Sequence, residues 1–267
     1  MSRIYLPTLL AAAVSFQAAA LVRALAEDAP KAPAEAPVPV PVPFTAPAAP
    51  APASDAATTK APGFTIEGWG KVTDPGGDCG VTLQGKVLKI TVPPTGPHDL
   101  APEIGVTNAP RVLQAVEGDF SIRVKVGGGY QPGGETTSNE RVAYNGAALI
   151  VMADPENVIT LARAVMQRGA LEPTPYANFE IRSQGRLLDM GSAATKPLTV
   201  DGPLWLRLER RGSQVTGAVS ADGEKWDALE PKEIPGTWPK TLHTGVAGIS
   251  TSAKAFEPAF SELRLEK

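Results

Sequence analysis

The chain has 267 residues, a formal net charge of −3 and 27 prolines. The net charge is slightly negative, and the sequence contains no run of lysines and arginines. Neither feature gives a reason to expect nucleic acid as a partner. The only cysteine is Cys79 and the only histidines are His98 and His243, which excludes an internal disulfide, a cysteine-rich zinc site and a histidine-rich metal site.

Residues 1–26 predict a secretory signal peptide. Arg3 supplies a positive start, residues 4–22 are largely apolar, and the Ala-Leu-Ala sequence at 24–26 fits a cleavage site. The apolar run includes proline, serine and glutamine and is short for a membrane span. We therefore expect a secreted, periplasmic or cell-envelope protein without a membrane span after cleavage. An uncleaved anchor is the alternative.

Residues 27–63 predict a disordered spacer rich in proline and alanine. Its Ala-Pro and Val-Pro steps remove backbone donors and fix φ, so it should neither nucleate a helix nor join a sheet. Such a segment favours an extended, polyproline-like conformation. It could hold the following domain away from a wall or membrane surface, or it could be a tail without a partner.

Residues 64–267 predict one all-β domain. Short segments alternate apolar and polar residues with period two, and Asp-Pro, Gly-Gly, Arg-Gly-Ser or Asp-Gly separate them. Residues 161–168 have the composition of a helical turn, but they follow a strand and a hairpin turn, so a strand is expected there. These features predict a two-sheet antiparallel β-sandwich. The expected strands are 64–72, 80–92, 110–116, 119–126, 144–153, 157–166, 177–183, 204–210, 214–220, 244–251 and 260–267.

The ribbon at 204–229 shows the alternation most clearly. Leu204, Leu206 and Leu208 share one face of the predicted strand, and Trp205 and Arg207 lie on the other. We expect the leucines to enter the core. The opposite face should look outward or line the hollow side of a curved sheet.

The sequence LWLRLERRGSQVTGAVSADGEKWDAL at 204–229 resembles a hairpin of concanavalin A-like (lectin/glucanase-type) jelly-roll domains. AALIVMADPENVITLAR at 147–163 resembles the preceding hairpin of that family, and FEPAFSELRL at 256–265 resembles its closing strand. The resemblance covers nearly all of residues 64–267. The chain is most similar to secreted domains of unknown function related to the yeast regulation-of-enolase protein. The fold hosts lectins, glycosidases and adhesion modules, so the resemblance implies the fold and leaves the activity open.

Glycosidases of this fold place acidic residues at alternate positions along one strand, and a retaining mechanism needs two carboxyl groups close together. No Glu-x-Asp-x-x-Glu pattern occurs in the expected strands, and Glu180 and Glu209 each stand alone. We therefore predict no catalytic residues and a non-catalytic domain that binds carbohydrate or a cell-envelope polymer. A glycoside-processing hydrolase of related fold and an envelope protein-interaction module are the alternatives.

The candidate ligand-binding residues of the loop at 97–111 are His98, Asp99, Asn108 and Arg111. Asp99 could orient the imidazole of His98, and Arg111 could bind a carboxylate or a sugar hydroxyl. In the structural alternative, Asp99 caps a turn and Arg111 pairs with it across the sheet edge.

Two further candidates, Trp205 and Arg207, lie on the predicted outer face of one strand. The indole of Trp205 could offer a flat, exposed surface to a sugar ring. No cofactor and no metal site are expected, because the aspartates in turns, such as Asp74 and Asp78, show no Asp-x-Asp calcium signature. We expect Cys79 to be a half-buried, unreactive side chain.

Overall fold

The computed structural model describes residues 63–192, 198, 200 and 202–267. The predicted signal peptide, and the predicted spacer except for its last residue, lie outside the described residues. The domain boundary at residue 64 remains a prediction. Among the residues described, no helix has the length and hydropathy that crossing a membrane requires.

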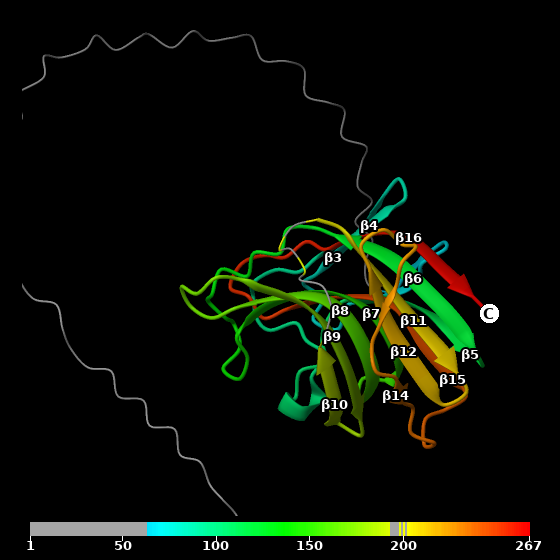
Figure 1. The fold of residues 1–267 in the computed structure, drawn as a ribbon. Helices are drawn as coiled ribbons and strands as arrows, with labels where there is room; N and C mark the ends of the chain where they lie inside the picture. The colour runs from blue at the N-terminus through cyan, green and yellow to red at the C-terminus, as the bar shows by residue number, and fades with distance from the viewer. Residues whose placement is uncertain (1–62, 193–197, 199, 201) are drawn as a thin grey trace, which may run out of the picture. The chain divides into compact units, whose positions relative to one another are not determined.

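The described residues form two antiparallel sheets that pack face to face, as the sequence predicts (Figure 1). We call them sheet A and sheet B. Sheet A has eight strands, and four neighbouring strands, β15, β7, β8 and β9, are its longest, with 10 to 12 residues each. In spatial order its strands are β1 (Thr65–Ile66), β2 (Gly70–Thr73), β5 (Arg111–Glu117), β15 (Thr241–Ser250), β7 (Ala143–Asp154), β8 (Asn157–Gln167), β9 (Thr174–Ser183) and β10 (Arg186–Ser192).

Sheet B lies against one face of sheet A and includes the ribbon at 204–229. The hairpin of β11 and β12 pairs Leu206 with Val219, and β11 also pairs with β6. In spatial order its strands are β13 (Asp227–Ala228), β12 (Gln214–Ser220), β11 (Leu204–Arg211), β6 (Phe120–Gly127), β16 (Ala259–Glu266), β4 (Val87–Thr91) and β3 (Gly80–Gln84), with β14 (Lys232–Glu233) also pairing with β12.

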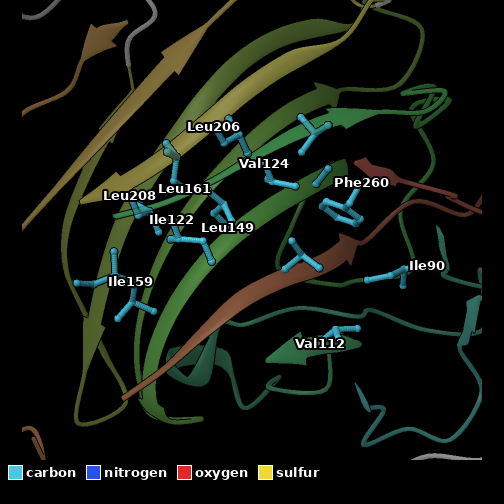
Figure 2. Packing of buried hydrophobic residues seen from close by; sticks show 14 of the residues in the cluster. Ile90, Val112, Ile122, Val124, Leu149, Ile159, Leu161, Leu206, Leu208 and Phe260 are labelled. Atoms are coloured by element: carbon cyan, nitrogen blue, oxygen red, sulfur yellow. The ribbon is translucent and has the colours of Figure 1, made fainter. Parts of the chain in front are cut away.

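The main hydrophobic core lies between the two sheets (Figure 2). Leu206 and Leu208 of β11 are fully buried there, and Leu149 of β7 and Leu161 of β8 enter the same core from sheet A. The prediction that the leucine face of the ribbon enters the core is thus confirmed. Burying a leucine side chain stabilises the fold by about 1.5–3 kcal/mol, so these buried leucines help to hold the two sheets together.

The structure differs from the predicted strands in several places. The expected strand at 80–92 is a hairpin of two strands, β3 and β4, joined by a turn at 85–86. Residues 64–72 form two strands rather than one, because Gly68 and Gly70 adopt positive φ values of 75° and 120° that turn the chain between β1 and β2. Strand β10 was not expected. A single 3₁₀ turn, η1, occupies Pro102–Ile104. The segment at 161–168 is a strand up to Gln167, as predicted, within β8.

The outer face of sheet A, which points away from sheet B, carries a second, smaller core. Residues 98–109, which we call the covering segment, run over this face. Leu100 and Ala109 of the segment pack on Ala148, Ile150 and Ala162 of the sheet. The covering segment is pinned at its start by backbone hydrogen bonds between His98 and Ser250. Part of the outer face is therefore sealed, and the part beside the segment is left open.

Candidate functional site

A cavity of about 370 Å³ opens on the outer face of sheet A, beside the covering segment. Side chains on a strand alternate between its two faces, so Tyr176, Asn178, Glu180 and Arg182 of β9 all point into this cavity. Their inward-facing neighbours, such as Phe179, belong to the core between the sheets. The pattern of β9 thus separates a core face from a polar, pocket-lining face.

A network of ion pairs forms one wall of the cavity. The Arg182 guanidinium is buried and donates to Glu180 (Nη1–Oε2 2.6 Å) and to Glu103 of the covering segment (Nε–Oε2 2.9 Å). Arg141 donates to the same Glu103 (Nη2–Oε1 2.7 Å) and approaches Asp99 at 3.9 Å. Charge-assisted hydrogen bonds of this kind are strong and directional. The network therefore ties the covering segment to β9 and orders the wall.

The carboxyl groups of this wall have different electrostatic environments. Burial raises the pKa of Asp99 to about 6, although the charge of Arg182, a backbone hydrogen bond and the charge of Arg141 oppose the rise. Burial also acts to raise the pKa of Glu103, but hydrogen bonds and charge from Arg182 and the charge of Arg141 outweigh it and lower that pKa. Glu103 is therefore held as a carboxylate, whereas Asp99 is only weakly stabilised in its charged form.

Two tyrosines face the cavity from neighbouring parts of the sheet. The rings of Tyr144 and Tyr176 meet edge to face, with centroids 6.4 Å apart. Burial raises the pKa of Tyr176 to about 12 and raises the pKa of Tyr144 well above its ordinary value, so both hydroxyls stay protonated near neutral pH. The apolar side chains of Leu187 and Met190 border the same cavity and are exposed. The site thus combines aromatic, apolar and hydrogen-bonding surfaces.

Two buried polar atoms at this site have no hydrogen-bond partner among the described residues. They are Thr160 Oγ1 of β8 and Asn178 Oδ1 of β9. Both residues line the cavity, and Thr160 pairs with Glu180 across the β8–β9 ladder. An unpaired buried polar group costs roughly 1–3 kcal/mol, so native structures almost always provide a partner. The geometry therefore leaves two unpaired hydrogen-bonding atoms beneath the surface of the cavity, which a bound molecule reaches only when neighbouring side chains move.

Of the candidate residues in the loop at 97–111, only Asp99 lines this cavity. His98 pairs not with Asp99 but with Asp78, at 3.0 Å between Nε2 and Oδ1. Asn108 accepts a hydrogen bond from the backbone N–H of Asp99 at 3.2 Å. Both His98 and Asn108 border a separate, open hollow. The predicted four-residue cluster is thus divided between two places.

Arg111 is buried and has a structural role. Its guanidinium donates to the carbonyl oxygens of Thr107 (3.3 Å) and Ala109 (2.9 Å), and burial lowers its pKa. The expected pairing of Arg111 with Asp99 is wrong, because the arginine is engaged by these carbonyls. Asp99 Oδ1 accepts from the backbone N–H of Leu100 (2.7 Å), which agrees with the turn-capping role.

Trp205 and Arg207 lie on the outer face of sheet B and do not line the cavity of sheet A. Trp205 is half-buried rather than fully exposed, because the turn at Gly223 lies against its ring. A Cβ atom at Gly223 would sit 2.9 Å from the indole. The Arg207 guanidinium stacks on Trp226 at 4.4 Å from the ring centroid. These contacts explain the positions of both side chains, and no ligand is needed to explain them.

Sequence reasoning missed most of the residues that line the cavity. A signal was present in YANFEIR at 176–182, where Tyr176, Asn178, Glu180 and Arg182 occupy every second position. Glu180 stands alone in the sequence because no second acidic residue lies near it on the same strand. Its neighbours in the structure are an arginine on its own strand and acidic residues of the covering segment.

No protein-family model matches the sequence, and no curated protein shows significant similarity to it. Among solved structures, a functionally unknown protein from Saccharomyces cerevisiae matches with a TM-score of 0.52 and 15% identity, over 69% of this chain and 90% of that one. The GH43 BlXynB protein from Bacillus licheniformis matches with a TM-score of 0.50 and 15% identity, over 72% of this chain but only 37% of that one. At these identities the likeness concerns the fold alone, which is a two-sheet β-sandwich.

Proposed function

We propose that this protein binds a carbohydrate, or another hydroxyl-rich polymer of the cell envelope, in the cavity on the outer face of sheet A and does not cleave it. This proposal rests on one observation: Thr160 Oγ1 and Asn178 Oδ1, in residues that line the cavity, have no hydrogen-bond partner among the described residues. A sugar hydroxyl both donates and accepts hydrogen bonds, so it can satisfy a hydroxyl and an amide oxygen at once. The predicted secretion would place the protein where such polymers occur.

The remaining surfaces of the cavity also suit a sugar. The rings of Tyr144 and Tyr176 offer apolar surface for the C–H faces of a pyranose, and their hydroxyls add hydrogen bonds. Arg141, about one-third exposed, provides planar donors for hydroxyl or carboxylate oxygens. The volume of about 370 Å³ falls within the range of roughly 300–1,000 Å³ typical of small-molecule sites.

A glycoside-processing hydrolase is the second candidate, and one observation favours it. Asp99 and Glu180 come from different segments of the chain but border the same cavity. Glycoside hydrolysis needs two carboxyl groups, one to protonate the leaving oxygen and one to act as a nucleophile or base. We favour binding alone because the carboxyl group of Glu180 is engaged by the buried Arg182 at 2.6 Å and is therefore not free to attack.

The test is to incubate the chain with a panel of glycans and cell-wall polysaccharides, measuring binding and released products in the same wells. We expect binding without products, weakened on the order of 10-fold or more by Asn178→Leu and by Tyr176→Ala. Trp205→Ala, on the outer face of sheet B, is the control and should bind as the wild type does. Products that disappear in Glu180→Gln would replace the proposal with the hydrolase. No binding to any glycan would contradict both and favour a protein partner.

A further inference from the structure

A cluster of side chains with metal-ligating atoms lies outside the cavity described above, where two turns meet. Asp78 and Cys79 belong to the turn between β2 and β3, and His98 lies at the start of the covering segment. One ligand atom from each of these three residues lies within 4.8 Å of the other two. Asp78 Oδ1 is 3.0 Å from His98 Nε2 and 3.6 Å from Cys79 Sγ.

The hydrogen bonding of His98 determines which of its nitrogens faces the cluster with a lone pair. His98 Nδ1 lies 3.0 Å from the carbonyl oxygen of Gly96, and a carbonyl oxygen only accepts, so Nδ1 carries the proton. In the neutral ring, Nε2 then points a lone pair at the Asp78 carboxylate. Two acceptors at 3.0 Å require a cation between them, either a proton on Nε2 or a bound metal. A backbone carbonyl on the other ring nitrogen is the usual arrangement behind a metal-bound histidine.

A further carboxylate makes the cluster more negative. Asp74 Oδ2 accepts from the backbone N–H of Cys79 at 2.8 Å, and Asp74 Oδ1 is buried without a hydrogen-bond partner in the described part of the chain. Two carboxylates and a thiol around one buried imidazole form a site that a positive ion would stabilise.

We propose that Asp78, Cys79 and His98 bind a divalent transition-metal ion of the zinc class. One oxygen, one sulfur and one nitrogen are the donor types that Zn²⁺ accepts, whereas Ca²⁺ and Mg²⁺ require oxygen ligands. Bonds of about 2.0–2.3 Å in a tetrahedral site separate neighbouring ligand atoms by roughly 3.3–3.7 Å. The two measured separations, 3.0 and 3.6 Å, are close to this range, so a small adjustment of side chains admits the ion.

The surroundings provide both access and a role for the ion. Asp78 and His98 border an open hollow of about 470 Å³, through which an ion and a water ligand can reach the site. Thr95 donates to the second oxygen of Asp78 and orients the carboxylate. A metal here would fasten the turn between β2 and β3 to the start of the covering segment. That segment carries Asp99 into the cavity on the outer face of sheet A and carries Glu103 into the ion pairs with Arg141 and Arg182, so the ion would stabilise the wall of that cavity.

The experiment is to treat the full chain with a chelator, remove the chelator, and titrate the protein with Zn²⁺ and, separately, with Co²⁺. We expect one Zn²⁺ per chain, a melting temperature raised by about 5 °C, and a thiolate-to-cobalt charge-transfer absorption. Cys79→Ser should abolish that absorption and weaken Zn²⁺ binding on the order of 100-fold. Zn²⁺ affinity in Asp78→Asn should fall similarly.

The two histidines of the chain supply the matched control. His98→Gln should lose Zn²⁺ binding, whereas His243→Gln, on an exposed position of β15, should keep it. His98 is buried, so His98→Gln could fail to fold. The cobalt spectrum of the wild-type protein tests the metal site without depending on that variant. A folded wild-type chain that binds no Zn²⁺, or that binds Co²⁺ without the thiolate absorption, overturns the proposal. Equal Zn²⁺ affinity in wild type and Cys79→Ser does the same. Glycan binding that survives in Cys79→Ser would leave the proposed function standing.

Discussion

The guanidinium of Arg182 donates a hydrogen bond of 2.6 Å to the carboxylate of Glu180, which lies two residues earlier on the same face of β9. The same guanidinium binds Glu103, 79 residues away in sequence. One buried cation thus fixes a residue of the sheet and a residue of the covering segment. The wall of the cavity is therefore formed before any ligand arrives, which limits the ordering that binding requires.

Arg182→Met should destabilise the protein by about 3–5 kcal/mol, because it leaves Glu180 and Glu103 near each other without their shared cation. Urea unfolding followed by tryptophan fluorescence measures the change. Arg211→Met is the control, since Arg211 is 65% exposed and pairs with Glu209 at the surface. That variant should lose less than about 1 kcal/mol. Equal losses in the two variants would show that the buried network does not hold the wall.

Glu103→Gln should lower stability by about 1 kcal/mol near neutral pH, because the charge-assisted bonds to Arg182 and Arg141 become ordinary ones. The folded-state pKa of Glu103 lies below its ordinary value of 4.5. The carboxylate therefore adds stability that is fully present above pH 4.5 and is lost as the pH falls through the folded pKa.

The measurement for Glu103 is the melting temperature of wild type and Glu103→Gln from pH 7 down to about pH 3. The two curves should converge as the pH falls below 4.5. Glu209→Gln is a suitable control, since Glu209 pairs with the exposed Arg211, and its difference from wild type should be small throughout. A Glu103→Gln difference that grows toward acid pH would contradict the sign argued here.

The core between the sheets gives a third prediction. Leu206→Ala should destabilise the protein by about 2–5 kcal/mol, because Leu206 is fully buried and its removal leaves a cavity between the sheets. Leu83→Ala on β3, where the side chain is 41% exposed, should lose less than about 1 kcal/mol. Chemical denaturation of both variants measures the difference. If Leu206→Ala lost as little stability as Leu83→Ala, the packing of the ribbon at 204–229 would not be what holds the two sheets together.

The fold followed from the sequence wherever one face of a strand meets the core. Leu204, Leu206 and Leu208 alternate with polar residues, and the structure buries all three. Strand β10 escaped prediction because Leu187 and Leu188 are adjacent, break the alternation, and are both exposed. At the edge of a sheet the hydrophobic pattern is weak, since neither face is fully buried.

The candidate site was only partly predictable. The sequence pointed to the loop at 97–111, and Asp99 of that loop lines the cavity. The partner of His98 proved to be Asp78, 20 residues earlier in another turn, a pairing that no local pattern indicates. The position of Thr160 opposite Glu180 depends on the register of β8 and β9. Strand register and contacts between turns that are distant in sequence are set by the tertiary fold. The sequence therefore indicated the loop but did not reveal which residues it contacts.

The unpaired threonine in the cavity leads to a prediction in which stability and binding move in opposite directions. Thr160→Val replaces a buried hydroxyl, which has no partner in the described part of the chain, with a methyl group of the same shape. Removing an unsatisfied polar atom should raise stability by about 1 kcal/mol. If that hydroxyl serves a sugar, the same change should weaken glycan binding by about 10-fold, because a ligand hydroxyl then loses its partner.

Thr244→Val is the matched control for this substitution. Thr244 is also fully buried in sheet A, but its hydroxyl donates to the carbonyl oxygen of Ile150 at 2.9 Å. Thr244→Val should therefore destabilise the protein by about 1–2 kcal/mol, and its folded fraction should bind glycan normally. Denaturant unfolding and glycan titration on both variants test the pair. If Thr160→Val also destabilises the protein and leaves binding unchanged, its hydroxyl serves the fold, and the observation on which the proposed function depends fails. If it stabilises the protein and impairs binding, the hydroxyl is maintained for a ligand at a cost in stability, which is the usual relation at a binding site.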